Sequence, residues 1–169
     1  MKILVTYSSQ TGNTRRLAEA IAAGLSGEVT LCPVKESPAT SGYDQLLHGF
    51  WVTTAGADEL SLEYLAGIWE REISLFGTMG ANPETAYGRS IASRLKNHLK
   101  RNQNTIGNWF LCKGEIDPAL IAWMKTLPEG HPQYPTPERR QNWEAARGHP
   151  DAADLAHAMK IFCSADVSS

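Results

Sequence analysis

The fold is decided near the start of the chain by the stretch Ile3-Leu4-Val5-Thr6-Tyr7-Ser8-Ser9-Gln10-Thr11-Gly12-Asn13-Thr14. Residues 3–7 are apolar, β-branched or aromatic with almost no polar alternation, which is typical of a central parallel strand covered on both faces. Small polar residues follow at 8–14, and from residue 14 to 25 the apolar positions recur at helical spacing. The sequence therefore predicts a buried strand, a small-polar loop and a helix in direct succession.

Four further strands are predicted, each as a short apolar run bounded by turn residues. They lie at 29–34, 46–52, 73–78 and 105–112. Apolar spacing and capping residues predict helices at 57–70, at 88–101, from Asp117-Pro118 onward, from Thr136-Pro137 to about 148, and after Asp151. Strands interleaved with helices in this way predict an α/β fold, a doubly wound five-stranded parallel sheet with helices on both faces.

We expect the whole chain, residues 1–169, to form one domain. Four of the nine prolines lie between 128 and 137, so residues 128–149 are expected to form an irregular proline-rich arm that packs across the sheet's edge. A C-terminal helix is expected at about 151–164. Its inward stripe should be Leu155, Ala158, Met159 and Phe162.

The composition limits the classes of function. Lysine plus arginine number 16 against 18 acids, and the net charge of −2 gives no whole-molecule case for binding nucleic acid or a membrane surface. No apolar stretch resembles a signal peptide or a membrane span, so a cytoplasmic location is expected. Cys32, Cys112 and Cys163 are widely spaced and are expected to be buried, reduced thiols. The histidines show no tight metal-ligand spacing, and no metal site is predicted.

Ligands of an open parallel sheet bind at the carboxyl ends of the strands, which singles out the loops at 8–14, 53–57 and 78–88. We call residues 8–14 the phosphate loop. Gly12 lets this backbone close tightly, and the loop opens onto a helix whose free amides and positive dipole end favour an anion. There is no G-x-x-x-x-G-K-[ST] and no G-x-G-x-x-G, so hydroxyls and amides alone favour a terminal monophosphate.

These residues resemble a known signature: Ser9-x-Thr11-Gly12-Asn13-Thr14 is similar to the [TS]-x-T-G-x-T phosphate motif of flavodoxins. The resemblance extends to 49–52, 76–80 and 113–118, and so covers essentially the whole chain. The segment 113–118, together with Gly130-His131-Pro132 and His149-Pro150-Asp151, resembles a small bacterial branch of flavodoxin-like proteins, some members of which accompany bilirubin reductase. The resemblance implies flavin mononucleotide (FMN) as cofactor and one-electron or two-electron transfer as the function.

The resemblance also implies the site, with the phosphate on the first loop and the flavin ring between the loop after Trp51 and residues 78–80. Trp51 and Tyr87 are the candidate stacking aromatics, although Trp51 could equally belong to the core. The peptide Ala55-Gly56 is a candidate for a backbone bond that changes with the redox state. No catalytic side chain is expected. The predicted FMN-binding residues are Ser8, Ser9, Gln10, Thr11, Gly12, Asn13, Thr14, Trp51, Thr53, Thr54, Ala55, Gly56, Thr78, Met79, Gly80, Ala81 and Tyr87.

Three functions remain open from the sequence. The first is an electron carrier that serves a partner reductase or another electron donor or acceptor protein. The second is a flavin-dependent reductase or NAD(P)H:acceptor oxidoreductase whose arm covers a substrate with His131, Tyr134, Arg139 and Arg140. The third is a scaffold that has lost flavin, against which the intact loop argues. The oligomeric state is left open.

Charged residues segregate around the predicted flavin loops. The acids are Asp58, Glu59, Glu63, Glu70 and Glu72, and the bases of the 88–101 helix are Arg89, Arg94, Lys96, Lys100 and Arg101. This pattern fits either solvated helix faces or a dipolar rim that orients a redox partner.

Overall fold

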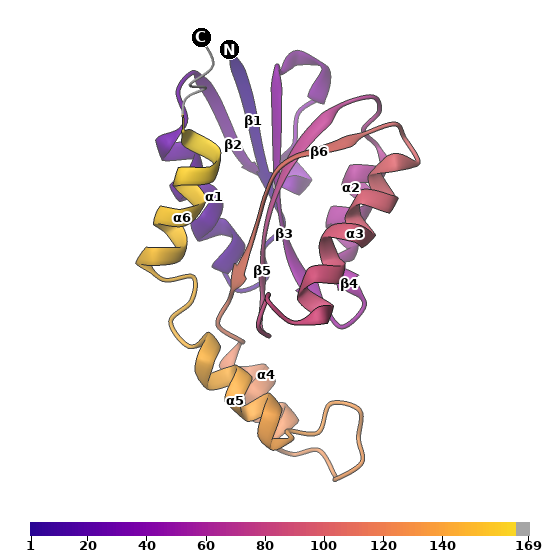
Figure 1. Ribbon diagram of the computed structural model, residues 1–169, viewed down its shortest axis with the longest axis vertical. Helices are drawn as coiled ribbons and strands as arrows, with labels where there is room; N and C mark the ends of the chain where they lie inside the picture. Colours follow the sequence, from indigo (N-terminus) through magenta and orange to yellow (C-terminus); the bar gives the residue numbers. More distant parts are fainter. Residues whose placement is uncertain (165–169) are drawn as a thin grey trace.

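A parallel sheet forms the centre of the computed structural model, which describes residues 1–164 (Figure 1). Its strands run in the order β2-β1-β3-β5-β6. The bounds are β1 (Lys2–Tyr7), β2 (Glu28–Pro33), β3 (Gln45–Thr53), β5 (Glu72–Met79) and β6 (Thr105–Lys113). All four pairings between them are parallel, which confirms the predicted five-stranded sheet. The sequence missed β4 (Gly56–Ala57), a short strand that pairs antiparallel with the end of β3.

Helices cover both faces of this sheet, as predicted (Figure 1). One face carries α1 (Asn13–Gly24) and α6 (Ala152–Cys163), and the other carries α2 (Glu59–Ala66) and α3 (Ala86–Lys100). Two short 3-10 helices, η1 (Val34–Glu36) and η2 (Thr40–Gly42), follow β2. The two helical layers explain why β1 lacks polar alternation. Ile3 and Val5 pack in the core beneath α1 and α6, whereas Leu4 packs in the core beneath α2 and α3.

Several helix boundaries differ from the predicted ones for a local reason. The helix predicted at 57–70 is only α2, because Ala57 belongs to β4 and the Asp58 carboxylate accepts a hydrogen bond from Ser61 N, which caps the helix start. In the same way the Thr85 hydroxyl accepts from Gly88 N, and α3 begins two residues earlier than predicted. On α6, Ala158 and Phe162 are buried, but Met159 is 37% exposed and does not belong to the inward stripe.

The three cysteines are free, and only Cys112 is buried, so the expectation of three buried thiols is wrong for Cys32 and Cys163. Burial raises the pKa of the Cys112 thiol and keeps it protonated.

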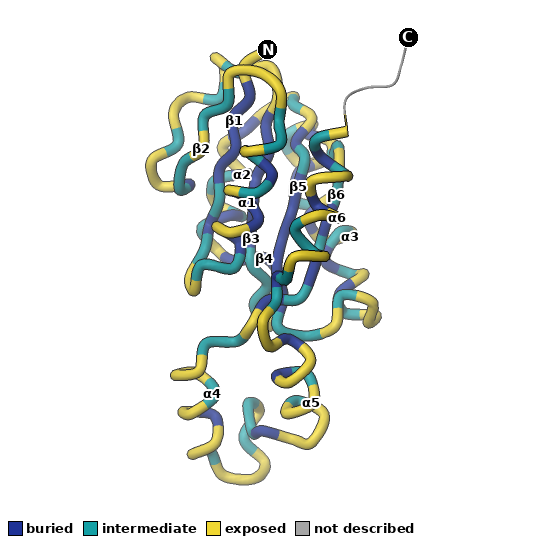
Figure 2. Tube along the Cα trace, turned by 90° about the vertical axis from the view of Figure 1, so that its left-hand side faces the viewer, coloured by how far each residue is buried: buried dark blue, intermediate teal, exposed yellow. Residues whose placement is uncertain are grey.

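The remaining two helices, α4 (Pro118–Met124) and α5 (Pro137–Ala146), stand beyond the carboxyl ends of the strands (Figures 1 and 2). We call residues 117–147 the lobe, and residues 113–116 with 148–151 its neck. Both predicted helix starts are confirmed, because Asp117 and Thr136 cap α4 and α5 and a proline follows each cap. The expectation that the arm packs across the sheet's edge is wrong. The lobe extends the molecule away from the sheet instead, and most of its residues are exposed (Figure 2).

Candidate functional site

A cavity of about 760 Å³ lies where the carboxyl ends of the strands meet the lobe. Most of the predicted site residues line it, namely Ser9, Gln10, Thr11, Asn13, Thr14, Trp51, Thr53, Thr54, Thr78, Met79, Gly80, Ala81 and Tyr87. Four of the predicted residues do not: Ser8, Gly12, Ala55 and Gly56. The cavity has a second wall, which consists of Gly114, Glu115, Ile116, Asp117, Leu120, Met124, Gln133, Arg139, Asn142 and Trp143. Of these, the sequence pointed only to Arg139, as part of an arm that covers a substrate; the other nine residues and Val52 were not predicted.

The phosphate loop ends in a helix start that carries no side-chain cap. Gly12 is the N-cap of α1 with φ of 95°, a left-handed conformation that favours glycine, and its N–H donates to the Ser9 hydroxyl at 3.1 Å. The first turn of α1 contains no acidic residue. Its free backbone amides and the positive end of the helix dipole are therefore available to an anion in the cavity.

Thr14 joins the phosphate loop to the ends of two strands. Its hydroxyl donates to the Phe50 carbonyl at 3.2 Å and lies 3.0 Å from the Thr78 hydroxyl, and the residue is 1% exposed. These contacts give Thr14 a structural role, because its only hydroxyl proton is already bound. Asn13 is also engaged, since its side-chain amide donates to the Glu115 carbonyl at 2.8 Å.

Ser8 does not line the larger cavity, and its hydroxyl belongs to a buried network. Its hydroxyl donates to Asp58 Oδ2 at 2.7 Å. The same carboxylate accepts from Trp51 N at 3.2 Å and, at the start of α2, from Ser61 N at 3.1 Å and the Ser61 hydroxyl at 2.8 Å. Asp58 thus ties the loop after β1 to the end of β3. Because it is only 2% exposed, it is not part of the acidic surface that the sequence suggested.

His48 extends this network into the core. Its Nε2 lies 2.8 Å from the Ser61 hydroxyl and its Nδ1 2.8 Å from the Thr6 hydroxyl. Because the single Ser61 proton goes to Asp58, the hydroxyl must accept from His48 Nε2–H, and Nδ1 then accepts from Thr6. Burial lowers the pKa of His48 to about 4, against a smaller opposing effect of the Asp58 charge. The imidazole is neutral with both nitrogens bonded.

The loop after β3 is held by its neighbours on α3. The Tyr87 hydroxyl donates to the Thr53 carbonyl at 2.5 Å, and Arg94 Nη1 donates to the Ala55 carbonyl at 3.2 Å. The Arg94 guanidinium also lies 5.4 Å from the centroid of the Tyr87 ring. Gly56, with φ of 123°, turns the chain back into β4.

Both candidate stacking aromatics line the cavity. Trp51 and Tyr87 are half-buried, and Trp51 also lines a second, smaller cavity of about 410 Å³ with Ser8, Lys35 and Glu63 among its walls. Trp51 is therefore a wall residue of both cavities and does not belong to the buried core.

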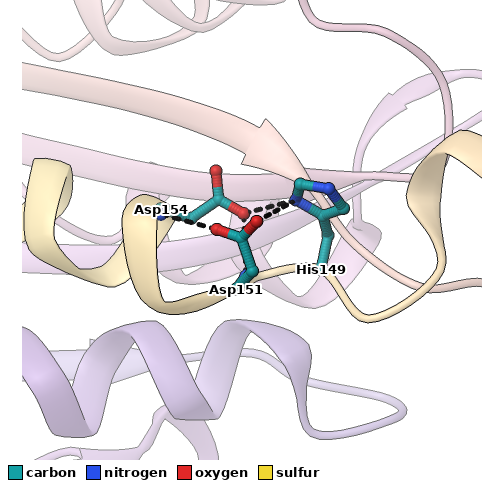
Figure 3. A group of neighbouring side chains, drawn as sticks. All are labelled: His149, Asp151 and Asp154. Carbon is teal, nitrogen blue, oxygen red and sulfur yellow. Dashed lines mark hydrogen bonds and ion pairs between the residues drawn. The ribbon is translucent and has the colours of Figure 1, made fainter.

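Hydrogen bonds of Glu115 join the two segments of the neck. Its N–H donates to the His149 carbonyl at 2.8 Å, and its carboxylate accepts from Gly148 N at 3.1 Å. On the far side His149 Nδ1 lies 2.6 Å from Asp154 Oδ2 (Figure 3). The Asn13 contact to the Glu115 carbonyl completes a chain of bonds from the phosphate loop to the start of α6.

The side chains of His149, Asp151 and Asp154 bring their potential ligand atoms within 4.8 Å of one another (Figure 3). Histidine spacing alone did not reveal this group, because two of its members are carboxylates. The two aspartates form a capping box at the start of α6, in which each side chain accepts from the other's N–H at 2.9 Å. Helix capping and the histidine contact account for the arrangement.

Comparisons with known proteins agree with this geometry. The model of the family described as "Flavodoxin domain" matches residues 4–163. The flavodoxin-like domain-containing protein BilS from Clostridioides difficile is 32% identical over 163 residues, which cover 94% of this chain and 92% of that protein.

Two solved structures share the fold. The oxidised flavodoxin 1 from Bacillus cereus has a TM-score of 0.53 at 14% identity, over 93% of this chain and 98% of that one. A flavoprotein from Lactobacillus acidophilus NCFM in complex with FMN has a TM-score of 0.50 at 13% identity, over 72% of this chain and 97% of that one. With a family match across residues 4–163 and a relative of 32% identity along most of its length, this chain belongs to the flavodoxin domain family.

Proposed function

We propose that this protein binds FMN in the 760 Å³ cavity and passes electrons to or from a partner oxidoreductase. The observation that carries the proposal is the meeting, in one cavity, of an uncapped helix start and two aromatic side chains, Trp51 near the end of β3 and Tyr87 in the first turn of α3. The flavodoxin domain family and the FMN complex of the Lactobacillus acidophilus flavoprotein support the choice of cofactor.

The residues of the cavity fit the chemistry of FMN. The uncapped first turn of α1 and the Ser9 and Thr11 hydroxyls would bind the phosphate, with no lysine or arginine in the loop. Trp51, Met79 and Tyr87 would enclose the apolar ring. Bound FMN supplies one-electron or two-electron redox chemistry. The chain's own contribution is to hold the ring, exclude water from part of it and present it near the surface.

Two exposed acids next to the site, against the single exposed base Lys35 on the same wall, support a protein partner. Glu59 and Glu63 are exposed and line the smaller cavity, which shares Trp51 with the larger one. Exposed charges beside the ring would orient a basic surface of a partner through long-range attraction. Among residues 1–164, no helix is both long enough and apolar enough to cross a membrane.

The matched ligand pair FMN and riboflavin tests the cofactor assignment, because the two differ only in the phosphate. Flavin-free protein is titrated with each, and quenching of flavin fluorescence gives the dissociation constants. We expect FMN to bind at least about 100-fold more tightly, since charge-assisted hydrogen bonds to the phosphate contribute about 1.5–3 kcal/mol each. Equal affinities, or no binding of FMN, would contradict the proposal.

A second candidate function, a reductase or NAD(P)H:acceptor oxidoreductase, is favoured by one observation: Gln133 and Arg139 of the lobe line the same cavity. Steady-state oxidation of NADH and NADPH by the FMN-loaded protein alone distinguishes the two. A carrier should show negligible turnover without its partner, whereas an oxidoreductase should turn over with an added acceptor.

A further inference from the structure

The cavity has two walls of different origin. The loop wall consists of residues from 9–14, 51–54 and 78–81 with Tyr87, and it accounts for the FMN site. The lobe wall consists of the ten other residues named above, which lie between Gly114 and Trp143 in the sequence. We propose that the lobe wall is a second binding site, next to the flavin, for a small apolar molecule that carries a single carboxylate. This inference rests on FMN occupying the loop wall.

The apolar part of the lobe wall is built from α4, α5 and the neck. Ile116, Leu120, Met124 and Trp143 line the cavity. Met124 and Trp143 are 7% and 9% exposed, whereas Leu120 is 44% exposed. A hydrocarbon or aromatic ligand would remove Leu120 and the neighbouring surface from water, which favours binding in proportion to the apolar area covered.

Arg139 supplies the positive charge on this wall. Its Nη1 donates to the Tyr134 carbonyl at 3.0 Å, which holds the side chain in place. Among residues 1–164, no ion pair within 4.0 Å involves Arg139. The guanidinium therefore retains donors for an anionic group, and a planar carboxylate matches its geometry. The side-chain amides of Gln133 and Asn142 lie on the same wall.

The acids on this wall limit the charge of the ligand. Glu115 and Asp117 also line the cavity. Glu115 accepts from Gly148 N at 3.1 Å and Asp117 accepts from Ala119 N at 2.9 Å, so both carboxylates are held by the backbone. Their negative charge opposes a ligand with several anionic groups. One carboxylate opposite Arg139, on an otherwise apolar body, is the ligand that this wall fits.

The test uses FMN-loaded protein and a matched pair of probes, 2-naphthoate and 2-naphthamide, which share one shape and differ in charge. Isothermal titration calorimetry measures the affinity for each. We expect 2-naphthoate to bind the FMN-loaded protein, and Arg139→Gln to weaken it about tenfold or more while changing the affinity for 2-naphthamide little. Flavin fluorescence should show unchanged FMN affinity in that variant.

Arg140 provides the matched control. It neighbours Arg139 on α5 and donates to the Pro135 carbonyl at 3.1 Å, but it is exposed and does not line the cavity. Arg140→Gln should leave 2-naphthoate binding unchanged. Arg139→Lys serves as a second variant that keeps the charge but not the planar fork, and it should show an intermediate loss. Circular dichroism confirms that each variant is folded.

Three outcomes would overturn the inference: no binding of 2-naphthoate to the FMN-loaded protein, equal weakening by Arg140→Gln, or displacement of FMN by 2-naphthoate. The last result would mean that both molecules use the loop wall. Failure of FMN itself to bind is a separate result that refutes the proposed function, and it is read from the flavin titration before any naphthoate is added.

Discussion

The Ser8 hydroxyl and the Asp58 carboxylate lie 2.7 Å apart, and this buried hydrogen bond joins the phosphate loop to the start of α2. The two residues are 50 positions apart in the chain. The other oxygen of Asp58 accepts from Trp51 N, so one carboxylate fixes both the loop after β1 and the end of β3 that carries a candidate stacking aromatic. The position of the cavity walls therefore depends on a residue that lies outside the cavity.

The neighbouring residues Ser8 and Ser9 are expected to have different roles, Ser8 in the buried network and Ser9 in the cavity. Ser8→Ala should lower the free energy of unfolding by about 1–2 kcal/mol, because it removes a buried hydrogen bond to a charged group, and should change FMN affinity little. Ser9→Ala should weaken FMN binding and change the free energy of unfolding little, since Ser9 lines the cavity. Urea unfolding and FMN titration of both variants provide the measurement. A larger loss of FMN affinity in the Ser8 variant would contradict the assignment.

The buried His48 should make stability depend on pH. The pKa of His48 is lowered to about 4 in the folded protein against about 6.5 unfolded, so between these values the unfolded chain binds more protons. The free energy of unfolding should accordingly rise with pH through this window and fall by about 3 kcal/mol in total as pH drops from 7 to 4. His48→Gln should lose this component in urea unfolding across pH 4–7. An unchanged pH profile in that variant would assign the dependence to other groups.

Two glycines with a left-handed backbone allow the effect of backbone strain on stability to be separated from an effect on FMN binding. Gly12 and Gly130 have φ of 95° and 92°, and an added Cβ would meet nothing within 4 Å at either position. Alanine should therefore cost about 1–2 kcal/mol of stability at both through backbone conformation alone. Only Gly12→Ala should also weaken FMN binding, because the strain there disturbs the backbone amides at the start of α1. Thermal unfolding and FMN titration test this, and equal FMN affinity in both variants would count against the phosphate loop.

We expect the hydrogen bonds of the neck to determine how often the lobe opens locally. Asp154→Asn removes the negative charge opposite His149 Nδ1 while keeping an oxygen for the capping box. Amides of residues 114–149 should then exchange with deuterium faster, whereas those of β1 and β3 should not change. Glu144→Gln, which removes an exposed ion pair with Arg147 within the lobe, is the control and should have little effect. Unaltered exchange in the Asp154 variant would mean that the Glu115 bonds to Gly148 and His149 are enough to hold the lobe.

Much of the fold could be predicted because it depends on short-range pattern. A strand such as β1, covered on both faces, leaves a continuous apolar run, and capped helix starts such as Asp117-Pro118 are local in sequence. The same holds for the phosphate loop, whose glycine and helix are contiguous. These features need no knowledge of distant contacts.

The rest depended on contacts between distant segments. The local sequence does not show that Ser8 bonds to Asp58 and does not line the cavity. Taken alone, Ser8 fits a phosphate-binding loop and Asp58 fits a helix cap, and the bond between them joins segments 50 positions apart. The direction of the lobe is set by the Glu115 bonds to Gly148 and His149, some 33 residues away. Because these bonds are not visible in the local sequence, packing across the sheet's edge was favoured over an arm that covers the cavity. The proline-rich composition indicated an irregular segment but not which surface it would reach.

The bond between Glu115 N and the His149 carbonyl places the beginning and the end of the lobe side by side. A segment whose two ends are neighbours can change its length or its residues while the strand before it and the helix after it keep their positions. The neck thus allows the lobe to change without disturbing the sheet. The sheet and its phosphate loop can stay fixed while residues 117–147 diverge to suit a different molecule.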